Sequence, residues 1–334
     1  MMGDKLGSDR KSVMVIEASD HSVQSLAPPN TLQRFEGIAF SPSGNTLAVA
    51  TSDTNTIFLY RRKPNGPFEE APSSSINGPA SSLNYPHDLT FSLFADSELL
   101  AVANRTGSIC IYQRNETTGV YRAEPVFEIR GRKAKLDFSD GVAFVRPNDE
   151  YLAACNLSAS RITFYRRTAG LAVGFTLEPE FELKHRSICS PDGLAFSQCG
   201  TWLAIANHGT HTVSVYQRQS RGPEYGPEPV TIIRDDSGLR YPHSVAFTPK
   251  TNHLAVTNAG ANYFSVYRPE HDWSYTTRWS QSPVLRQTVG PNSIFQQVNA
   301  RNKMEGGPKG IAVHQNKLAV CSPQHGIKIY SFVE

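Results

Sequence analysis

The chain has 334 residues, of which 39% are hydrophobic and 10% aromatic, so it can bury a packed core. Its 33 basic and 30 acidic side chains give a formal charge of +3, which argues against a nucleic-acid partner, and no apolar stretch is long enough to predict a membrane span. Five cysteines without C-x-x-C spacing predict reduced thiols, and with no apolar leader we expect a cytoplasmic protein.

The first 34 residues precede the repeated part of the chain. Residues 1–10 are polar and predict a disordered leader. Two short strand candidates follow, at 12–16 and 22–26.

From residue 35 onward, one pattern recurs six times with a period near 50 residues. Each copy opens with a short apolar strand, continues through a turn to a strand resembling Leu-Ala-Val-Ala, and reaches a third strand that ends in Tyr. The copies open at 35–40, 86–91, 139–144, 191–196, 242–247 and 308–313, and their third strands end at Tyr60, Tyr112, Tyr165, Tyr216, Tyr267 and Tyr330. Such a period indicates one repeat array over 11–334, although the length alone would suggest two domains.

A fourth strand follows a Gly- and Pro-rich turn in the early copies, but the chain ends at Glu334 before the last copy can supply one. Supplying that strand from the N-terminal residues would close a ring without open sheet edges. We therefore predict an all-β, six-bladed β-propeller with four antiparallel strands per blade. Its blades are expected near 35–84, 85–137, 138–189, 190–240, 241–306 and 307–334 plus 11–28. A seven-bladed ring with one degenerate blade, in 11–34 or 280–307, is the alternative.

In this architecture the residue before the Gly, Ser or Asp of each first strand points toward the mouth of the central channel, at the face that we call the top. These six ring residues are Glu36, His87, Asp140, Asp192, His243 and Lys309. A purely structural position would favour one residue type, whereas this set is mixed. It predicts a binding pocket for a small polar molecule.

A second group lies at the ends of the second strands. It comprises Asp53, Asn104, Asn156, Asn207, His208 and Asn258. Ligand binding is one interpretation of this group. The other is that these side chains cap turns in every blade, which the regular recurrence of Asn favours. Tyr85, Phe138 and Tyr241 precede ring residues and would add an aromatic wall to the pocket.

The ring residues have the chemistry of a catalytic site. Glu36, Asp140 and Asp192 could act as bases or hold a divalent cation such as Ca²⁺ or Mg²⁺. His87 and His243 could transfer protons or bind a softer ion, and Lys309 could neutralise a carboxylate or an oxyanion.

Two further features lie around the rim. An insertion at 287–307 lengthens the step from His243 to Lys309 and predicts a lid or binding loop at the top, or a plain variable loop. At the opposite, bottom face the third strands are followed by arginines such as Arg114, Arg167 and Arg218. These would be solvated turn residues or a docking rim for an acidic protein partner.

The segment Pro-His-Ser-Val-Ala-Phe-Thr-Pro at 242–249, with Leu-Ala-Val-Thr-Asn at 254–258 and Ser-Val-Tyr at 265–267, resembles the YVTN-type repeat of lactonase-like propellers and, loosely, the WD repeat. Glu36-Gly37 and Pro191-Asp192-Gly193 resemble the calcium-ligand positions of gluconolactonase-type six-bladed propellers. The resemblance implies the propeller fold over nearly the whole chain. It leaves two functions open, a lactonase-like hydrolase and a non-catalytic protein-interaction scaffold that uses its rim loops.

Overall fold

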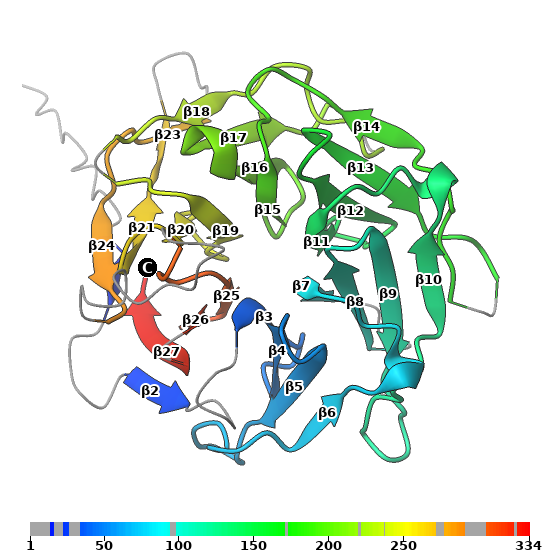
Figure 1. Cartoon of the computed structure of the whole chain (residues 1–334). Coiled ribbons are helices and arrows are strands. Elements are labelled where there is room, and N and C mark those ends of the chain that lie inside the picture. Colours follow the sequence, from blue (N-terminus) through cyan, green and yellow to red (C-terminus); the bar gives the residue numbers. More distant parts are fainter. Residues whose placement is uncertain are drawn as a thin grey trace, which may run out of the picture.

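The computed structural model describes residues 14–16, 23–26, 34–93, 98–170, 173–219, 222–236, 238–271, 277–290, 305–323 and 326–334. Six antiparallel sheets surround one axis as the blades of a propeller, which confirms the predicted fold class (Figure 1). In the described residues the helical structure consists of three one-turn 3-10 helices, η2 (Pro79–Ser81), η3 (Arg132–Ala134) and η4 (His208–Thr210). The predicted leader at 1–10 lies outside the described residues.

Blades 1 to 5 each run outward from the axis in chain order. Blade 1 contains β3 (Phe35–Phe40), β4 (Thr46–Thr51), β5 (Thr56–Arg61) and β6 (Ser74–Ile76). Blade 2 contains β7 (Pro86–Phe91), β8 (Leu99–Asn104), β9 (Ser108–Gln113) and β10 (Phe127–Arg130). Blade 3 contains β11 (Ser139–Phe144), β12 (Tyr151–Asn156), β13 (Arg161–Arg166) and β14 (Phe181–Leu183).

Blade 4 contains β15 (Pro191–Phe196), β16 (Trp202–Asn207), β17 (Thr212–Gln217) and β18 (Thr231–Ile233). Blade 5 contains β19 (Pro242–Phe247), β20 (Leu254–Asn258), β21 (Tyr263–Tyr267) and β24 (Leu285–Thr288). Between its last two strands the chain adds a hairpin that the sequence did not predict, β22 (Pro269–His271) and β23 (Thr277–Trp279). The buried ring of Trp279 packs against Trp202 and Phe247, so the hairpin covers the core between blades 4 and 5.

The sixth blade joins the two ends of the chain. It contains β25 (Ile311–His314), β26 (Lys317–Ser322) and β27 (Gly326–Val333), and the N-terminal β1 (Val15–Ile16) and β2 (Val23–Leu26) complete it. Both N-terminal strands pair with β27: β2 from Val23 opposite Tyr330 to Leu26 opposite Ile327, and β1 opposite Val333 and Phe332. The predicted closure is therefore present, and two N-terminal strands provide it.

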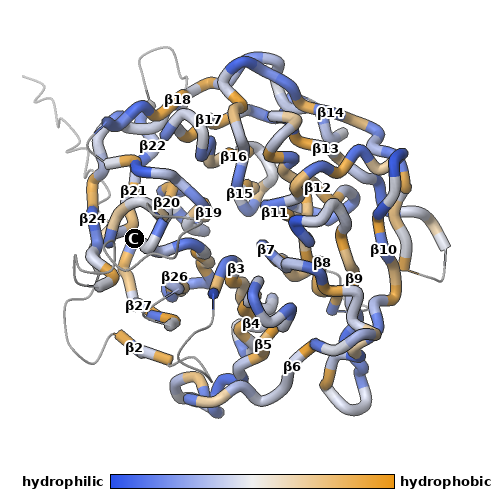
Figure 2. The backbone as a smooth tube through the Cα atoms, viewed as in Figure 1, coloured by the Kyte–Doolittle hydropathy of each residue, from blue (hydrophilic) through white to orange (hydrophobic). Residues whose placement is uncertain are grey.

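The hydrophobic core is divided among the interfaces between neighbouring blades. Each buried cluster combines residues of two adjacent blades, and the cluster between blades 6 and 1 includes Leu26, Phe35 and Ile329. Figure 2 shows the hydrophobic residues mainly within the strands, with hydrophilic residues in the turns that connect them. The second strands are buried throughout their length because they face a neighbouring blade on both sides, which explains their Leu-Ala-Val-Ala character.

The recurring Tyr near the end of each third strand is also buried, and in blades 2 to 4 its hydroxyl helps to fix the link from the preceding blade. Tyr112 donates to the carbonyl of Ser81 in η2, and Tyr165 donates to the carbonyl of Ala134 in η3 at 2.5 Å. Tyr216 shares a hydrogen bond of 2.8 Å with Ser187 Oγ. The recurring Tyr is therefore a structural residue of the repeat.

Candidate functional site

Six inner strands begin at the top face and bring the six ring residues to the axis. In five of them the strand register shifts at the first residues, so that Glu36, His87, Asp140, Asp192 and His243 lie inside the shift. Such a bulge turns a side chain out of the ordinary alternation, here toward the channel. The blades approach closely at this level: a Cβ on Gly193 would lie 2.4 Å from the carbonyl oxygen of His243. This approach therefore requires glycine at position 193.

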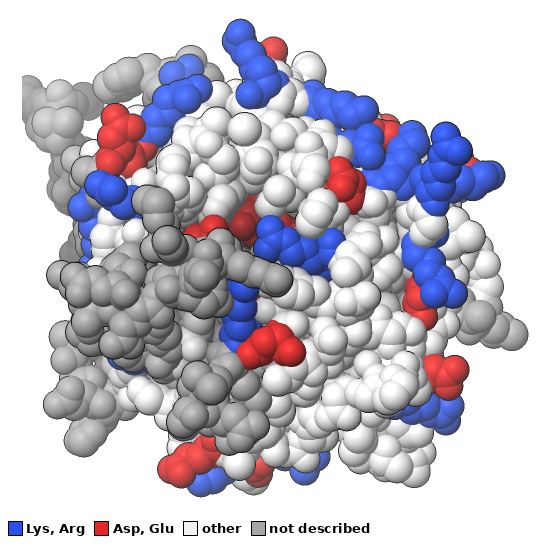
Figure 3. All heavy atoms as spheres, viewed as in Figure 1, with Lys and Arg blue, Asp and Glu red and all other residues white. Residues whose placement is uncertain are grey.

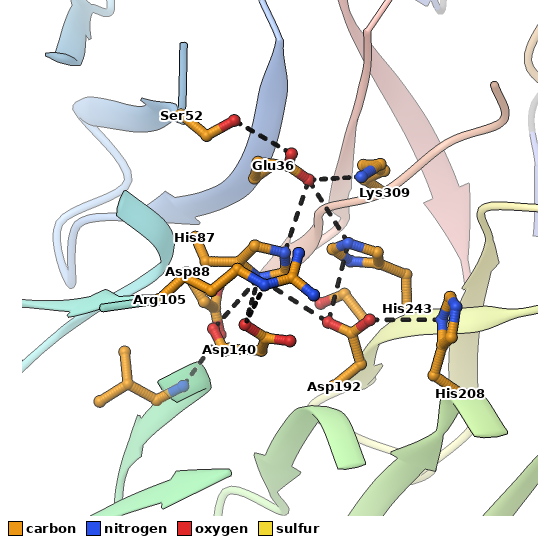
Figure 4. A network of polar contacts seen from close by, with 12 residues as sticks. Glu36, Ser52, His87, Asp88, Arg105, Asp140, Asp192, His208, His243 and Lys309 are labelled. Carbon is orange, nitrogen blue, oxygen red and sulfur yellow. Dashed lines mark hydrogen bonds and ion pairs between the residues drawn. The ribbon is translucent and has the colours of Figure 1, made fainter. Parts of the chain in front are cut away.

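The ring residues do converge, as the sequence predicted, and between 0% and 5% of each residue's surface is exposed. They form one network of polar contacts (Figure 4). Figure 3 shows the same face hollowed around the axis, with atoms of acidic and basic side chains in the hollow.

Glu36 is surrounded by cations. Its Oε2 lies 2.7 Å from Lys309 Nζ, its Oε1 lies 2.7 Å from Arg34 Nε, and Ser52 Oγ donates to Oε1 at 3.1 Å. Burial by itself would raise the pKa of Glu36, but the charges of Lys309 and its other neighbours outweigh burial and hold the pKa well below its usual range. Glu36 is therefore an ionised carboxylate whose two oxygens are both occupied.

His87 and His243 stack on each other in the centre of the ring, with ring centroids 4.9 Å apart. His87 Nε2 and His243 Nε2 lie 3.7 and 3.5 Å from Glu36 Oε2, and His87 Nδ1 lies 3.7 Å from Asp192 Oδ1. Burial lowers the pKa of His243 to about 4 and that of His87 well below its usual value. Both imidazoles are therefore neutral at pH 7 and can accept a proton.

Asp140 and Asp192 lie on the other side of the histidines. Burial raises the pKa of Asp140 to about 7, although Arg105, whose Nε lies 3.3 Å from Asp140 Oδ1, acts in the opposite direction. Burial and the charge of Asp140 raise the pKa of Asp192 well above its usual range. This pair can hold a proton near neutral pH, so the site contains neutral bases and protonated acids as close neighbours.

Three polar residues that the sequence analysis did not assign to the site complete it: Arg34, Arg105 and Glu305. Glu305 Oε1 lies 3.2 Å from His208 Nε2 and its Oε2 lies 3.7 Å from Lys309 Nζ. Burial opposes protonation of His208, yet Glu305 and Asp192 outweigh it and raise its pKa. A repeat signal was available for Arg105, because it occupies the position after the second strand that His208 occupies in blade 4, and both reach a ring carboxylate.

Several polar atoms of this cluster are buried without a hydrogen-bond partner in the described part of the chain. They are Asp140 Oδ1 and Oδ2, Asp192 Oδ1 and His243 Nε2. The neighbouring charges lie within ion-pair distance but without the alignment of a hydrogen bond. Leaving such a group unsatisfied costs about 1–3 kcal/mol, so the atoms suit a ligand that supplies hydrogen-bond donors.

The three predicted cation ligands do not form one group in the described part of the chain. Two groups of three side chains bring ligand atoms within 4.8 Å of one another: Glu36 with His87 and His243, and His87 with Asp140 and Asp192. In the first group Lys309 Nζ already lies 2.7 Å from the Glu36 oxygen that a metal would use. The second group includes two of the predicted ligands and has unpartnered oxygens, which suit a divalent cation, so the cation site stays a prediction.

The asparagines at the strand ends serve the chain itself. Each side-chain oxygen accepts a hydrogen bond from the backbone that enters the same blade: Asn104 from Asn84, Asn156 from Asp137, Asn207 from Cys189 and Asn258 from Arg240. Each amide nitrogen donates to a nearby hydroxyl, as Asn156 does to Thr163 at 3.0 Å. These contacts favour the turn-capping interpretation over ligand binding. Asp53 accepts from the backbone of Arg34 at 3.1 Å in an exposed position.

Two of the predicted aromatic residues stand beside the network. The guanidinium of Arg34 lies 5.8 Å from the ring centroid of Tyr85, and the ring of Tyr241 contacts His208 at 4.9 Å. Phe138 is 50% exposed. Of the insertion at 287–307, residues 291–304 lie outside the described residues, and Glu305 near its end enters the site.

Several arginines of the bottom rim form hydrogen bonds within their own loops. Arg62, Arg114 and Arg218 each donate from Nε to the carbonyl of a glycine in the loop that follows, at 3.0, 3.1 and 2.9 Å. The basic cluster at 130–135 forms ion pairs as well, including Lys133 with Glu178 and Lys135 with Glu182.

The comparisons with known proteins identify the architecture. No family model matches the chain, and no curated protein matches it in sequence. Solved structures match at 11–13% identity. The β-propeller domain of Cps50 (Swd1) from Myceliophteria thermophila is 13% identical, covers 89% of this chain and 83% of that one, and has a TM-score of 0.56.

Virginiamycin B lyase from Staphylococcus aureus is 11% identical over 96% of this chain and 100% of that one, with a TM-score of 0.52. A chain of the Mitotic Checkpoint Complex is 11% identical over 100% and 97%, with a TM-score of 0.59. At these identities the neighbours show the fold alone, so the similarity to lactonase-like repeats stays a resemblance. Within the described residues no helix is long and apolar enough to cross a membrane.

Proposed function

We propose that this protein binds a small polar molecule at the top of its channel and hydrolyses a lactone or a related ester there. The observation that carries the proposal is the set of unpartnered polar atoms of Asp140, Asp192 and His243, which are buried at the centre of the ring. Burying so many ionisable groups is costly, and a ligand that bonds to them offsets that cost.

The protonation states support acid–base chemistry. A neutral His243 would take a proton from water while the water oxygen forms a bond to the acyl carbon of the substrate. The acyl carbon–oxygen bond then breaks, and a protonated Asp192 gives its proton to the departing alkoxide. His243 Nε2 lies 3.7 Å from Asp192 Oδ1, so the proton on the imidazole can return to the carboxylate and restore the site.

Arg105 is placed to stabilise negative charge that develops on the substrate. Its side chain is 29% exposed, and it faces a carboxyl group that is partly protonated at pH 7, so its guanidinium can turn to an oxyanion. Lys309 is the less suitable group, because its ammonium is paired with Glu36 at 2.7 Å. If His87, Asp140 and Asp192 held a divalent cation, both carboxyl groups would be ionised, and the cation would polarise the carbonyl of the substrate in place of acid catalysis by Asp192.

Hydrolysis of glucono-1,5-lactone and δ-valerolactone, followed by acid release in a weak buffer, tests the proposal. The rate should rise with pH through about 4, as His243 loses its proton, and fall at or above about 7, as the Asp140 and Asp192 pair loses its proton. Asp192→Asn and His243→Gln should each lower kcat by roughly 10²–10⁴-fold. Asp236→Asn, an exposed change away from the ring, should leave it unchanged.

The alternative function is a scaffold that binds a protein partner through its rim loops. It predicts no turnover by the wild-type protein and no effect of Asp192→Asn on partner binding. Lack of hydrolysis with and without Mg²⁺, Ca²⁺ or Mn²⁺, together with no binding of the lactones or their hydroxy acids by calorimetry, would reject the proposal.

A further inference from the structure

A large cavity of the described structure lies away from the ring, at the bottom end of the same axis. It has a volume of about 1040 Å³, and none of the six ring residues lines it. The ring residues are themselves buried and lie nearer the top end of the axis. The cavity is therefore a separate space from the proposed active site.

A ring of small residues forms part of its wall. One residue from each inner strand, two positions beyond the Gly, Ser or Asp of the repeat, contributes: Ala39, Thr90, Ala143, Ala195, Ala246 and Ala312. Five of the six are alanines, so the wall is apolar at this level, whereas polar side chains such as Gln198 and Asn316 line it elsewhere. Two large hydrophobic residues, Leu93 and Val333, line the cavity and are 46% and 55% exposed.

Blade 2 departs from the other five at two adjacent levels of this wall. It has Thr90 where the others have Ala, and Asp88 where four blades have Gly and blade 5 has Ser244. Asp88 is half-buried and lies at the inner end of the cavity, directly after the ring residue His87. An architecture that needed only small residues here would not require this carboxyl group.

The described residues give Asp88 no counterion. Its Oδ2 accepts a hydrogen bond from the backbone of Val142 at 3.1 Å, which holds the carboxyl group in place between blades 2 and 3. At the mouth Arg146 is paired with Asp149 at 2.5 Å, and the backbone N–H of Lys250 donates to Glu334 at 3.1 Å.

We propose that the bottom cavity binds a small organic cation, an amine with an apolar body, whose ammonium group pairs with Asp88 and bonds to Thr90. The volume suits a molecule of drug size, and the alanine wall suits an apolar body. The carboxyl group at the inner end supplies the charge complementarity and fixes the orientation of the ligand.

The test compares two probes of the same shape, 1-naphthylmethylamine and 1-naphthylmethanol, titrated into the full chain and followed by naphthyl fluorescence. The amine should bind the wild-type protein more tightly than the alcohol. Asp88→Asn should weaken amine binding by about tenfold or more and leave alcohol binding within about twofold. Thr90→Val should weaken the amine by a smaller factor, and Ala195→Leu should weaken both probes because it fills the cavity.

Two controls locate the effect. Asp192→Asn, in the ring, should leave amine binding unchanged, so a failure of the proposed hydrolysis does not decide this test. Thermal unfolding of each variant verifies that it is folded, and Thr90→Val replaces Asp88→Asn if the latter is not. Equal affinity of the amine for the wild-type protein and the folded Asp88→Asn variant, or no binding to the wild-type protein at millimolar concentration, would overturn the proposal.

Discussion

Replacing Asp140 by Asn should make the protein more stable at alkaline pH while removing the proposed activity. Burial raises the pKa of Asp140 from 3.8 to about 7, so the folded protein opposes ionisation that the unfolded chain allows. The protonated carboxyl group therefore contributes fully to the stability of the fold below pH 3.8. This contribution is lost as the pH rises through 7. A shift of about three pKa units corresponds to about 4 kcal/mol at pH 8.

The amide of the Asp140→Asn variant would keep the shape of the side chain but cannot ionise. The variant should therefore be as stable as the wild-type protein near pH 4 and should exceed it by the full amount at pH 8. For a chain of this length, about 4 kcal/mol corresponds to an increase in Tm of roughly 5 °C. Scanning calorimetry of both proteins at pH 4 and pH 8 measures the difference. A gap that is the same at the two pH values, or a less stable variant at pH 8, would refute the reasoning.

Three further changes test other contacts. Lys309→Met should destabilise the protein by about 3–5 kcal/mol in urea unfolding, because it removes the partner of a buried carboxylate, and Glu36→Gln in the same chain should restore part of the loss. Gly193→Ala places a Cβ 2.4 Å from the His243 carbonyl oxygen and should lower Tm. Gly66→Ala, where the nearest atom to the new Cβ would be 3.3 Å away, should have little effect. Equal losses of Tm in the two variants would argue against close packing at the axis. Deleting residues 1–26 removes β1 and β2 and should expose the edge of β27, which light scattering would detect as aggregation; a monomer of unchanged Tm would contradict the described closure.

The fold was readable from the sequence because every copy of the repeat repeats the same local chemistry. The Leu-Ala-Val-Ala strands and the terminal Tyr are buried in equivalent ways, so six weak signals support one another. The hairpin β22–β23 was missed because the equivalent connections in blades 1 to 4 form only one isolated bridge each, such as Arg218 with Tyr225, and therefore have no strand pattern to detect.

The six ring residues were predictable for the same reason, because their position within the repeat is fixed even though their identity varies. Their ionisation was not predictable. Asp140 and Glu36 are both buried carboxyl groups, yet burial raises the pKa of Asp140, while the pKa of Glu36 is lowered because Lys309 and Arg34 both form ion pairs with it. Glu305 was missed because it lies in an irregular segment and does not occupy a position of the repeat.

The pairing of β2 and β1 with β27 also has a consequence for synthesis in the cell. The partners of Val23 and Ile16 are Tyr330 and Phe332, so β1 and β2 cannot pair until β27 has left the ribosome. Until then the nascent propeller is an open arc whose first and sixth blades have not met, and the pairing of β2 with β27 closes it.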